Sequence, residues 1–312
     1  MKKISTTYSM QKKQRNLIEN DFSLNKENKC IELKFLSNIS KSKIFISSET
    51  GLIFHKNNRD SLSIVNEWSK KIYSNKMDPK KGLYSDDFPG MSSRHFFVLD
   101  FLSRELNMQK KNIIDFACGQ GGLLLKARQH FNCKNLTGVE HSSENIKIIK
   151  SRFRKNKVTQ PQLYSSSIER FKSRKKFDIG FLTWTLCNCA EPLDIIKSIS
   201  SLIKKNGILV VAESSRILVP FKKPIFNYFN AKKDIGHIHP WHWTLNSLSN
   251  IFKLFGFEIL RTNRYFDEDN LVIVFKNSQN FSQKFNFDNP KKIIDFLKRW
   301  KAESMRFKEF DV

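Results

Sequence analysis

The stretch "NIIDFACGQGG", residues 112–122, decides the fold of this chain. Its apolar run ends at an acid, Asp115, and a glycine cluster follows directly. The next residues, "LLLKARQHF" (123–131), have the composition of a helix. This order predicts a strand that turns sharply into a helix and presents backbone N–H groups to a ligand. Two classes of adenosine-bearing cofactor are bound at such a turn: dinucleotides and S-adenosyl-L-methionine.

The charge at this turn separates the two classes. The dinucleotide fingerprint needs glycines where Ala117, Gly119 and Gly122 stand, which is only a near-match. Asp115 would lie beside the diphosphate of a dinucleotide, and like charges about 4 to 6 Å apart cost on the order of 1 kcal/mol. S-adenosyl-L-methionine carries an ammonium and a sulfonium group and no phosphate. The carboxylate therefore favours S-adenosyl-L-methionine as the cofactor.

A second acid, Glu140, ends the next apolar run, "NLTGVE" (135–140). In adenosine-binding α/β folds an acid at this place accepts the two ribose hydroxyls. Gly119 and Gly121 lack a Cβ, so the backbone of the turn can approach the ligand closely. Asp115, Gly119, Gly121 and Glu140 are therefore the predicted cofactor-binding residues.

Strand and helix patterns alternate after the turn, which predicts an α/β fold: a Rossmann-like, doubly wound, mostly parallel sheet with an antiparallel closing strand. We expect a helix over 191–205 that is closed by Asn206-Gly207, and a final hairpin of 257–266 with 270–277. The expected strands of the parallel part are 112–117, 135–140, 162–167, 177–184 and 208–213. A ligand should lie at the carboxyl ends of these strands.

The chain divides into three expected units. Residues 1–90 lack the alternation and end in the turn-rich "NKMDPKKGLYSDDFPG", so they form a small N-terminal accessory unit. Residues 91–277 form the cofactor-binding core. Residues 278–312 form a C-terminal helical extension, because "NPKKIIDFLKRWKAESMRF" has an amphipathic pattern.

The core resembles the class I S-adenosylmethionine-dependent methyltransferases. "DFACGQGG" is similar to their D-x-G-x-G-x-G loop and "GVEHS" to their ribose-binding acid. Ala117 replaces the first glycine of the loop, and we expect it at a negative φ. The resemblance implies that Thr183 and Trp184 lie beside the cofactor's methyl group, with core packing as the alternative for Trp184. It places Ser167 and Ile168 near the adenine.

A narrower resemblance is to the sugar C-methyltransferase group, which joins a small zinc-binding domain to this core. It rests on "SETGLIFHKN", "SRHFFVLDFL" and "HPWHWTLNSL". Ser47 and Thr50 occupy the places of two zinc-binding cysteines, so the resemblance implies a degenerate zinc-ribbon-like unit without a metal. It also implies that Tyr84 and Arg94 reach the cofactor's carboxylate.

The histidines of "GHIHPWHW" (236–243) are the candidate catalytic groups. Neutral imidazole suits proton abstraction near pH 7, and the same resemblance favours His239 as the base, with His237 beside it in an extended segment. Two alternatives stay open: solvated histidines in an aromatic loop, and a metal site for which Asp234 is the only nearby acid.

The residues after the fourth strand constrain the methyl acceptor. "TWTLCN" (183–188) stands where class members that methylate amino groups have Asn/Asp-Pro-Pro-Tyr/Phe. Cys187 and Cys189 are interpreted as structural thiols, because Leu186 replaces the proline that precedes the nucleophile of a cytosine C5-methylase. We therefore expect an enzyme that methylates a small anionic metabolite, such as a nucleotide-linked sugar.

A net charge of +25 raises the alternative of an RNA methyltransferase, since Lys and Arg neutralise phosphates. The basic residues are spread along the chain, which instead favours a generally basic surface. A non-catalytic cofactor-binding subunit is the remaining alternative. No apolar run reaches the roughly 18 residues that span a bilayer, and the five cysteines form no disulfide pattern, so we expect a cytoplasmic protein without a membrane partner.

Overall fold

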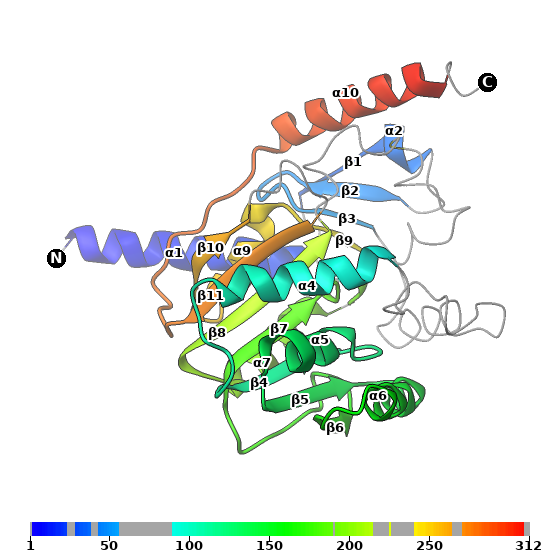
Figure 1. Ribbon diagram of the computed structural model, residues 1–312. Coiled ribbons are helices and arrows are strands. Elements are labelled where there is room, and N and C mark those ends of the chain that lie inside the picture. Colours follow the sequence, from blue (N-terminus) through cyan, green and yellow to red (C-terminus); the bar gives the residue numbers. More distant parts are fainter. Residues whose placement is uncertain are drawn as a thin grey trace.

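A seven-stranded sheet forms the centre of the computed structural model, which describes residues 2–23, 29–38, 43–55, 89–189, 191–214, 225, 240–263 and 270–308. The strand order is β10-β11-β8-β7-β4-β5-β6 (Figure 1). The strands are β4 (Asn112–Phe116), β5 (Asn135–Glu140), β6 (Gln162–Ser165), β7 (Phe177–Thr183), β8 (Ile203–Ser214), β10 (Phe257–Thr262) and β11 (Asn270–Asn277). Strands β4 to β8 are parallel, and β11 is antiparallel to β8 and β10. The predicted α/β fold, with its antiparallel closing strand, is confirmed.

Helices cover both faces of this sheet because its strands are apolar on both sides. In β8, Leu209 and Val211 join one buried cluster, whereas Val210 and Ala212 join the other. The first cluster includes residues of α7 (Pro192–Leu202) and α9 (Leu245–Lys253). The second includes residues of α4 (Pro89–Ser103), α5 (Gly122–Phe131) and α6 (Ser143–Lys155).

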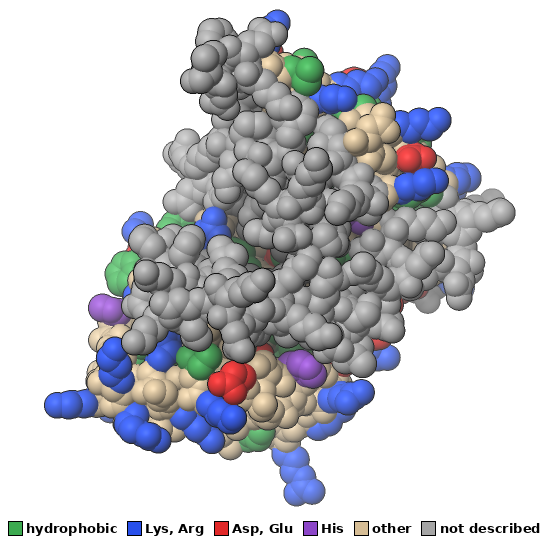
Figure 2. All heavy atoms as spheres, turned by 90° about the vertical axis from the view of Figure 1, so that its right-hand side faces the viewer, with side chains coloured by type: hydrophobic (Ala, Val, Ile, Leu, Met, Phe, Trp, Pro, Cys, Tyr) green, Lys and Arg blue, Asp and Glu red, His purple; other side chains and the backbone are tan. Residues whose placement is uncertain are grey.

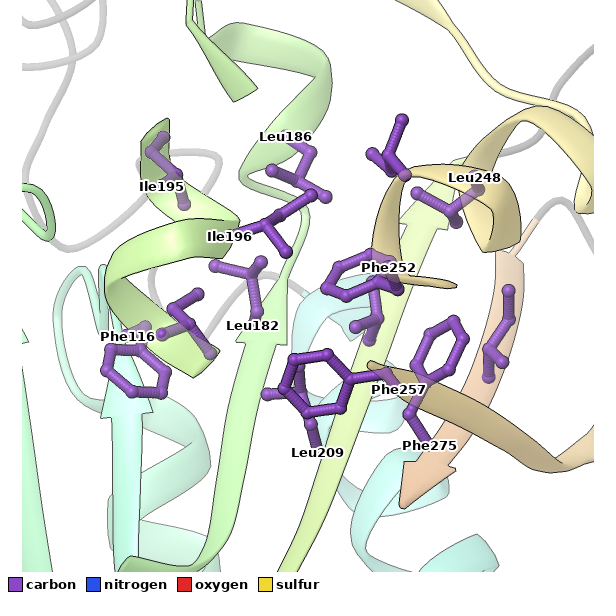
Figure 3. Packing of buried hydrophobic residues seen from close by; sticks show 14 of the residues in the cluster. Phe116, Leu182, Leu186, Ile195, Ile196, Leu209, Leu248, Phe252, Phe257 and Phe275 are labelled. Carbon is purple, nitrogen blue, oxygen red and sulfur yellow. The ribbon is translucent and has the colours of Figure 1, made fainter. Parts of the chain in front are cut away.

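Figure 3 shows the first cluster from close by. Ile196 of α7 and Phe252 of α9 lie on the same side of the sheet as Leu182 of β7 and Leu209 of β8, in one buried cluster. All four side chains are fully buried. Burying one such side chain contributes roughly 1.5 to 3 kcal/mol, so this layer fixes α7 and α9 on the sheet.

The predicted end of the helix over 191–205 is wrong. Helix α7 ends at Leu202, and Asn206-Gly207 lies inside β8, where Asn206 has φ +61°. The β7–β8 ladder shifts its register between Phe177 and Ile179, opposite this segment. Ile203 is buried against Gly180, so burial in the sheet outweighs the local turn signal.

A second, four-stranded antiparallel sheet has the order β1-β2-β3-β9. It consists of β1 (Cys30–Glu32), β2 (Ile44–Ser47), β3 (Ile53–His55) and β9 (Trp241–His242). Short helix α2 (Lys34–Ser37) and the long α10 (Pro290–Lys308) pack with it in one cluster, and α10 lies above it in Figure 1. The sheet thus takes one strand from the predicted core; the division into three units stays a prediction.

The turn between β2 and β3 is held by side-chain oxygens where the narrower resemblance places zinc ligands. Ser47 Oγ accepts the N–H of Thr50 at 3.2 Å. The Thr50 hydroxyl donates to the carboxyl of Asp21, the last residue of α1 (Lys2–Asp21), and accepts the N–H of Leu52 at 3.2 Å. This network joins the N-terminal helix to the second sheet.

Among the described helices, none combines the length and the apolarity that crossing a bilayer requires.

The expected negative φ of Ala117 is wrong, because its φ is +54°. The Cys118 N–H donates to Val139 O at 3.0 Å, and this bond holds the turn in its left-handed conformation. A left-handed conformation costs a residue with a Cβ about 1 to 2 kcal/mol. We therefore expect Ala117→Gly to raise the free energy of unfolding by about 0.5 to 1 kcal/mol, measured by urea denaturation. Ala127→Gly, inside α5, is the matched control and should lower the free energy of unfolding by about 1 kcal/mol. If Ala117→Gly also lowered the free energy of unfolding, the backbone of Ala117 would not be strained.

Burial raises the pKa of Asp21 from 3.8 to about 6, although the Thr50 and Ser47 hydroxyls oppose the shift. A carboxyl with a raised folded-state pKa favours folding fully below pH 3.8, and this contribution is lost as pH rises through 6. The unfolding free energy of the unsubstituted protein should therefore fall by roughly 2 to 3 kcal/mol between pH 4 and pH 7. This fall should be absent in Asp21→Asn. Chemical denaturation of both proteins across this range measures the difference; parallel curves would contradict it.

Candidate active site

The carboxyl ends of the parallel strands bring most of the predicted site residues to one edge of the sheet. Asp115 pairs in register with Gly138 of β5 and with Phe181 of β7, so β4 lies between its two neighbours (Figure 1). The predicted residues at this edge are Asp115, Ala117, Gly119, Gly121, Glu140, Ser167, Ile168, Thr183 and Trp184. Figure 2 shows described Lys and Arg side chains in the lower part and at the upper right of this face.

Glu140 holds the glycine turn against the end of β5. Its Oε2 accepts the N–H of Gly119 at 2.8 Å. Its Oε1 accepts the N–H of Ser142 at 2.9 Å and the amide of Asn145 at 3.3 Å. A carboxylate has about four lone-pair positions, so these three bonds leave about one for a ligand. A contact with both ribose hydroxyls would have to replace one of these bonds.

Asp115 is almost fully buried at the end of β4, with 2% of its surface exposed. Among the described residues its Oδ1 has no hydrogen-bond partner. Burial, and then the nearby charge of Glu140, raise the pKa of the Asp115 carboxyl well above 3.8. Burial is also the main reason why the pKa of Glu140 is raised. An unpartnered buried carboxyl is costly, and a cationic group beside it would remove that cost.

Glycine stands at the two predicted positions, 119 and 121, for different structural reasons. Gly119 has φ +53°, and a Cβ there would meet nothing within 4 Å, so its face is open. Gly121 has φ +75°, and its Cβ would lie 2.9 Å from Cγ1 of Ile149, so close packing on α6 requires glycine. The open face of Gly119 is the one at which a ligand could approach the backbone.

Trp184 is fixed at the end of β7 by several contacts. Its backbone has φ +50° and its N–H donates to Ala212 O at 2.6 Å. The indole N–H donates to Asn270 Oδ1 at 3.1 Å. The guanidinium carbon of Arg94 lies 5.9 Å from the ring centroid, and the His95 ring lies 5.7 Å from it. The structure thus brings Arg94 of α4 to the same edge, together with His95, which was not among the predicted site residues.

The remaining predicted residues differ in their surroundings. Ser167 is partly buried, while Ile168 is 5% exposed and belongs to a core cluster with Phe171. Thr183 ends β7 and is partly buried. Tyr84, His237 and His239 lie outside the described residues.

Glu213, near the end of β8, is a buried acid that was not among the predicted site residues. Its Oε1 accepts the N–H groups of Thr185 at 3.0 Å and Leu186 at 2.7 Å, which begin a short 3₁₀ turn, η1 (Leu186–Asn188). Burial raises the pKa of Glu213 to about 7. The sequence pattern could have predicted Glu213, because "ILVVAE" is an apolar run that ends in an acid, as in β4 and β5.

The thiol of Cys189 lies beside this turn. Burial, and then the charge of Glu213, raise its pKa well above 9. A nucleophilic cysteine needs a lowered pKa, so this environment favours the interpretation of Cys189 as a structural thiol. The carbonyl of Cys189 accepts the indole N–H of Trp241 at 2.6 Å, which ties the turn to β9 of the second sheet.

Within the described ranges no three His, Cys, Asp or Glu side chains group together as a metal site would require. Two buried histidines do meet, since Nε2 of His55 and Nε2 of His242 are 2.8 Å apart across β3 and β9. These two rings join the neighbouring strands of the second sheet.

The described residues fit S-adenosyl-L-methionine. Asp115 presents a buried, unpartnered oxygen, and Gly119 has an open face beside it. An ammonium group matches the first feature, and a closely approaching methionine or ribose part matches the second.

Comparison with known proteins agrees with this chemistry. A protein-family model described as "Methyltransferase domain" matches residues 93–262, more than half of the chain. The chain is 33% identical over 124 residues to the ubiquinone biosynthesis O-methyltransferase of Pelagibacter ubique (strain HTCC1062), covering 39% of this chain and 50% of that protein. It is 27% identical over 127 residues to the protein of the same name from Actinobacillus pleuropneumoniae serotype 7 (strain AP76), covering 38% and 53%. The chain thus spans about half the length of these relatives.

Two solved structures are among those similar to this chain. The magnesium protoporphyrin IX methyltransferase of Synechocystis PCC 6803 with bound SAH is 17% identical, with a TM-score of 0.49, covering 70% of this chain and 95% of that chain. The N-methyltransferase NodS from Bradyrhizobium japonicum WM9 is 18% identical, with a TM-score of 0.43, covering 62% and 98%.

The family model covers the main sheet from β4 to β10, together with the turn that contains Ala117 and Gly119. The predictions of a methyltransferase and of its cofactor are confirmed at the level of the family. This chain belongs to the class I S-adenosylmethionine-dependent methyltransferases.

Proposed function

We propose that this chain transfers the methyl group of S-adenosyl-L-methionine to a hydroxyl oxygen of a small anionic metabolite. The observation that carries the proposal is the buried carboxyl of Asp115, whose Oδ1 has no described partner, beside the open face of Gly119. The printed names of the curated relatives, both O-methyltransferases, support oxygen as the acceptor atom. The absence of the amino-group motif in "TWTLCN" supports it too.

Each residue of the edge has a proposed part. Asp115 binds the cofactor's ammonium group, and the glycine turn, held by Glu140, carries its methionine and ribose parts. Bound S-adenosyl-L-methionine supplies an electrophilic methyl carbon, so the protein's task is to align the acceptor and to remove its proton. Trp184 and Thr183 border the acceptor. Arg94, stacked on Trp184, supplies a positive charge.

His239 remains the proposed base, with His237 as its neighbour. A hydroxyl group is a poor nucleophile until its proton is removed, and neutral imidazole is suited to accept that proton near pH 7. Tyr84 remains a proposed contact of the cofactor's carboxylate, and Ser167 and Ile168 remain proposed neighbours of the adenine.

Three alternatives are separated by the acceptor. A nucleotide-linked sugar is an anionic metabolite with free hydroxyls, so it remains a candidate within the proposal. The net charge of +25 keeps an RNA acceptor as the second alternative. A non-catalytic subunit would bind the cofactor and transfer nothing.

Methyl transfer from S-adenosyl-L-[methyl-³H]methionine should label a hydroxylated small molecule. The panel is a catechol carboxylate, a nucleotide-linked sugar and mixed RNA. The product's label should be released as methyl iodide by hot hydriodic acid, which cleaves ethers and leaves C-methyl groups intact. Labelled RNA would contradict the proposal, as would acid-stable label. If neither the panel nor a cell-extract metabolite pool became labelled, the non-catalytic alternative would be favoured. The matched control is His239→Ala, which should be inactive.

Binding of S-adenosylhomocysteine should tighten as pH rises. Burial raises the pKa of Asp115 in the free protein, and a neighbouring ammonium group favours its ionised form, so binding should release a proton over the pH range between the two pKa values. Calorimetry in two buffers of different ionisation enthalpy measures that proton.

Asp115→Asn should weaken this binding at least tenfold, about 1.4 kcal/mol, and remove the pH dependence that it causes. Glu140→Gln is the companion variant, because the pKa of Glu140 is also raised. An unchanged proton release in Asp115→Asn would place the ammonium group elsewhere.

A further inference from the structure

The described acidic and basic side chains of the core are distributed unequally between the two edges of the main sheet. Basic side chains occur in the segments that lead into or begin the five parallel strands. Ten of them are Lys110 and Lys111 before β4, Lys134 before β5, Lys155 and Lys157 before β6, Arg174, Lys175 and Lys176 before β7, and Lys204 and Lys205 in β8. We call this set the basic rim. All of its members are exposed except Lys111, which is half-buried.

Acids are nearly absent from the basic rim. The segments 107–111, 132–134, 155–161, 172–176 and 203–207 contain no Asp or Glu. Nearby, Asp178 of β7 pairs with Lys204 at 2.7 Å and accepts the N–H of Asn112 at 2.8 Å. The carboxyl-end edge, by contrast, has the acids Asp115, Glu140, Glu169, Glu191 and Glu213.

Helix dipoles explain only part of this separation. Helix α6 ends at the rim with Arg152, Arg154 and Lys155 in its last turn, where cations are favourable. Arg174, Lys175 and Lys176 follow no helix, because they stand between β6 and β7. Lys110 lies beyond the last turn of α4. Helix dipoles therefore do not account for these charges, although Lys204 pairs with Asp178, Lys176 donates to Ser201 O and Lys175 lies over the ring of Phe177.

We propose that the basic rim binds the phosphate backbone of a nucleic acid, without regard to sequence and apart from methyl transfer. Neighbouring strands are about 4.8 Å apart, so the rim extends roughly 20 Å from β6 to β8. Eight of its nine exposed members are lysines, and lysine is a compact point charge that suits phosphate contacts without base recognition. Figure 1 shows these loops on the side of the sheet opposite the arrowheads of the parallel strands.

A nucleic acid fits this surface better than an anionic bilayer. Stable association with a bilayer takes an apolar element in addition to charge. The exposed large apolar side chains of the described residues all lie outside the rim segments: Met10, Ile31, Phe96, Ile259, Leu260, Phe281 and Met305. Because the rim and the cofactor residues occupy opposite edges, a nucleic acid bound here is a partner and not the methyl acceptor.

The test is the binding of a fluorescein-labelled 20-nucleotide polyuridylate, followed by anisotropy over a salt series. The triple variant Arg174→Glu, Lys175→Glu, Lys176→Glu should bind at least tenfold more weakly at 0.1 M salt. Three lost phosphate contacts should reduce the slope of log K against log salt by about 2. The second triple, Lys110→Glu, Lys134→Glu, Lys155→Glu, should behave alike, and it covers the case in which the first disturbs folding through the contact of Lys176 with Ser201 O.

The matched control is Lys291→Glu, Lys292→Glu, Lys298→Glu on α10, which changes the net charge equally at exposed positions. It should change the affinity less than threefold. Equal losses in control and rim variants would overturn the proposal, because diffuse charge would then explain the binding. Binding to phosphatidylglycerol vesicles without binding to the oligonucleotide would also overturn it. Binding of S-adenosylhomocysteine should stay unchanged in every variant, so this result is independent of the proposed function.

Discussion

The hydrogen bonds that Glu140 accepts are the constraint on which the site depends. Its carboxylate takes the N–H groups of Gly119 and Ser142, so one side chain fixes the turn after β4 and the start of α6 together. Strands β4 and β5 are neighbours in the sheet, which makes this short link possible. Burying a carboxylate is costly unless its oxygens are used, and here they are used by the backbone that forms the site. The ligand then meets a turn that is already in place, which lowers the entropy cost of binding.

The same arrangement recurs along the edge of the sheet. Glu213 holds the turn after β7 as Glu140 holds the turn after β4. Asp115 and Glu213 each have one buried oxygen without a hydrogen-bond partner among the described residues. Two of these buried acids therefore organise backbone, and the proposed role of Asp115 is to bind a cation. This division explains why a site for a positively charged cofactor can lie in a chain whose net charge is +25. The ten bases of the basic rim lie at the opposite edge.

The second sheet is connected to the site through its fourth strand. Trp241 of β9 donates to Cys189 O, and Phe22, next to α1, stacks on the neighbouring Trp243 with ring centroids 6.2 Å apart. The turn after β7 thus rests on the main sheet through Glu213 and on the second sheet through Trp241. Substitutions in the second sheet can be expected to act on the acceptor side of the site, since the two share this turn.

Much of the fold followed from the sequence, because apolar runs that end in an acid and are followed by glycine or serine carry strand, turn and helix signals together. Asp115, Glu140 and the alternation after them needed no tertiary information. The sequence could not show that Ala117 takes a left-handed φ, that Ile203 belongs to a strand, or that β9 joins residues far away in the chain. These features depend on which side chains are buried together, and burial is decided by contacts between distant segments. For the same reason, only the tertiary structure could show that the bases of the basic rim share one edge of the main sheet. They belong to five short segments that are far apart in the sequence, and these segments come together when the strands align.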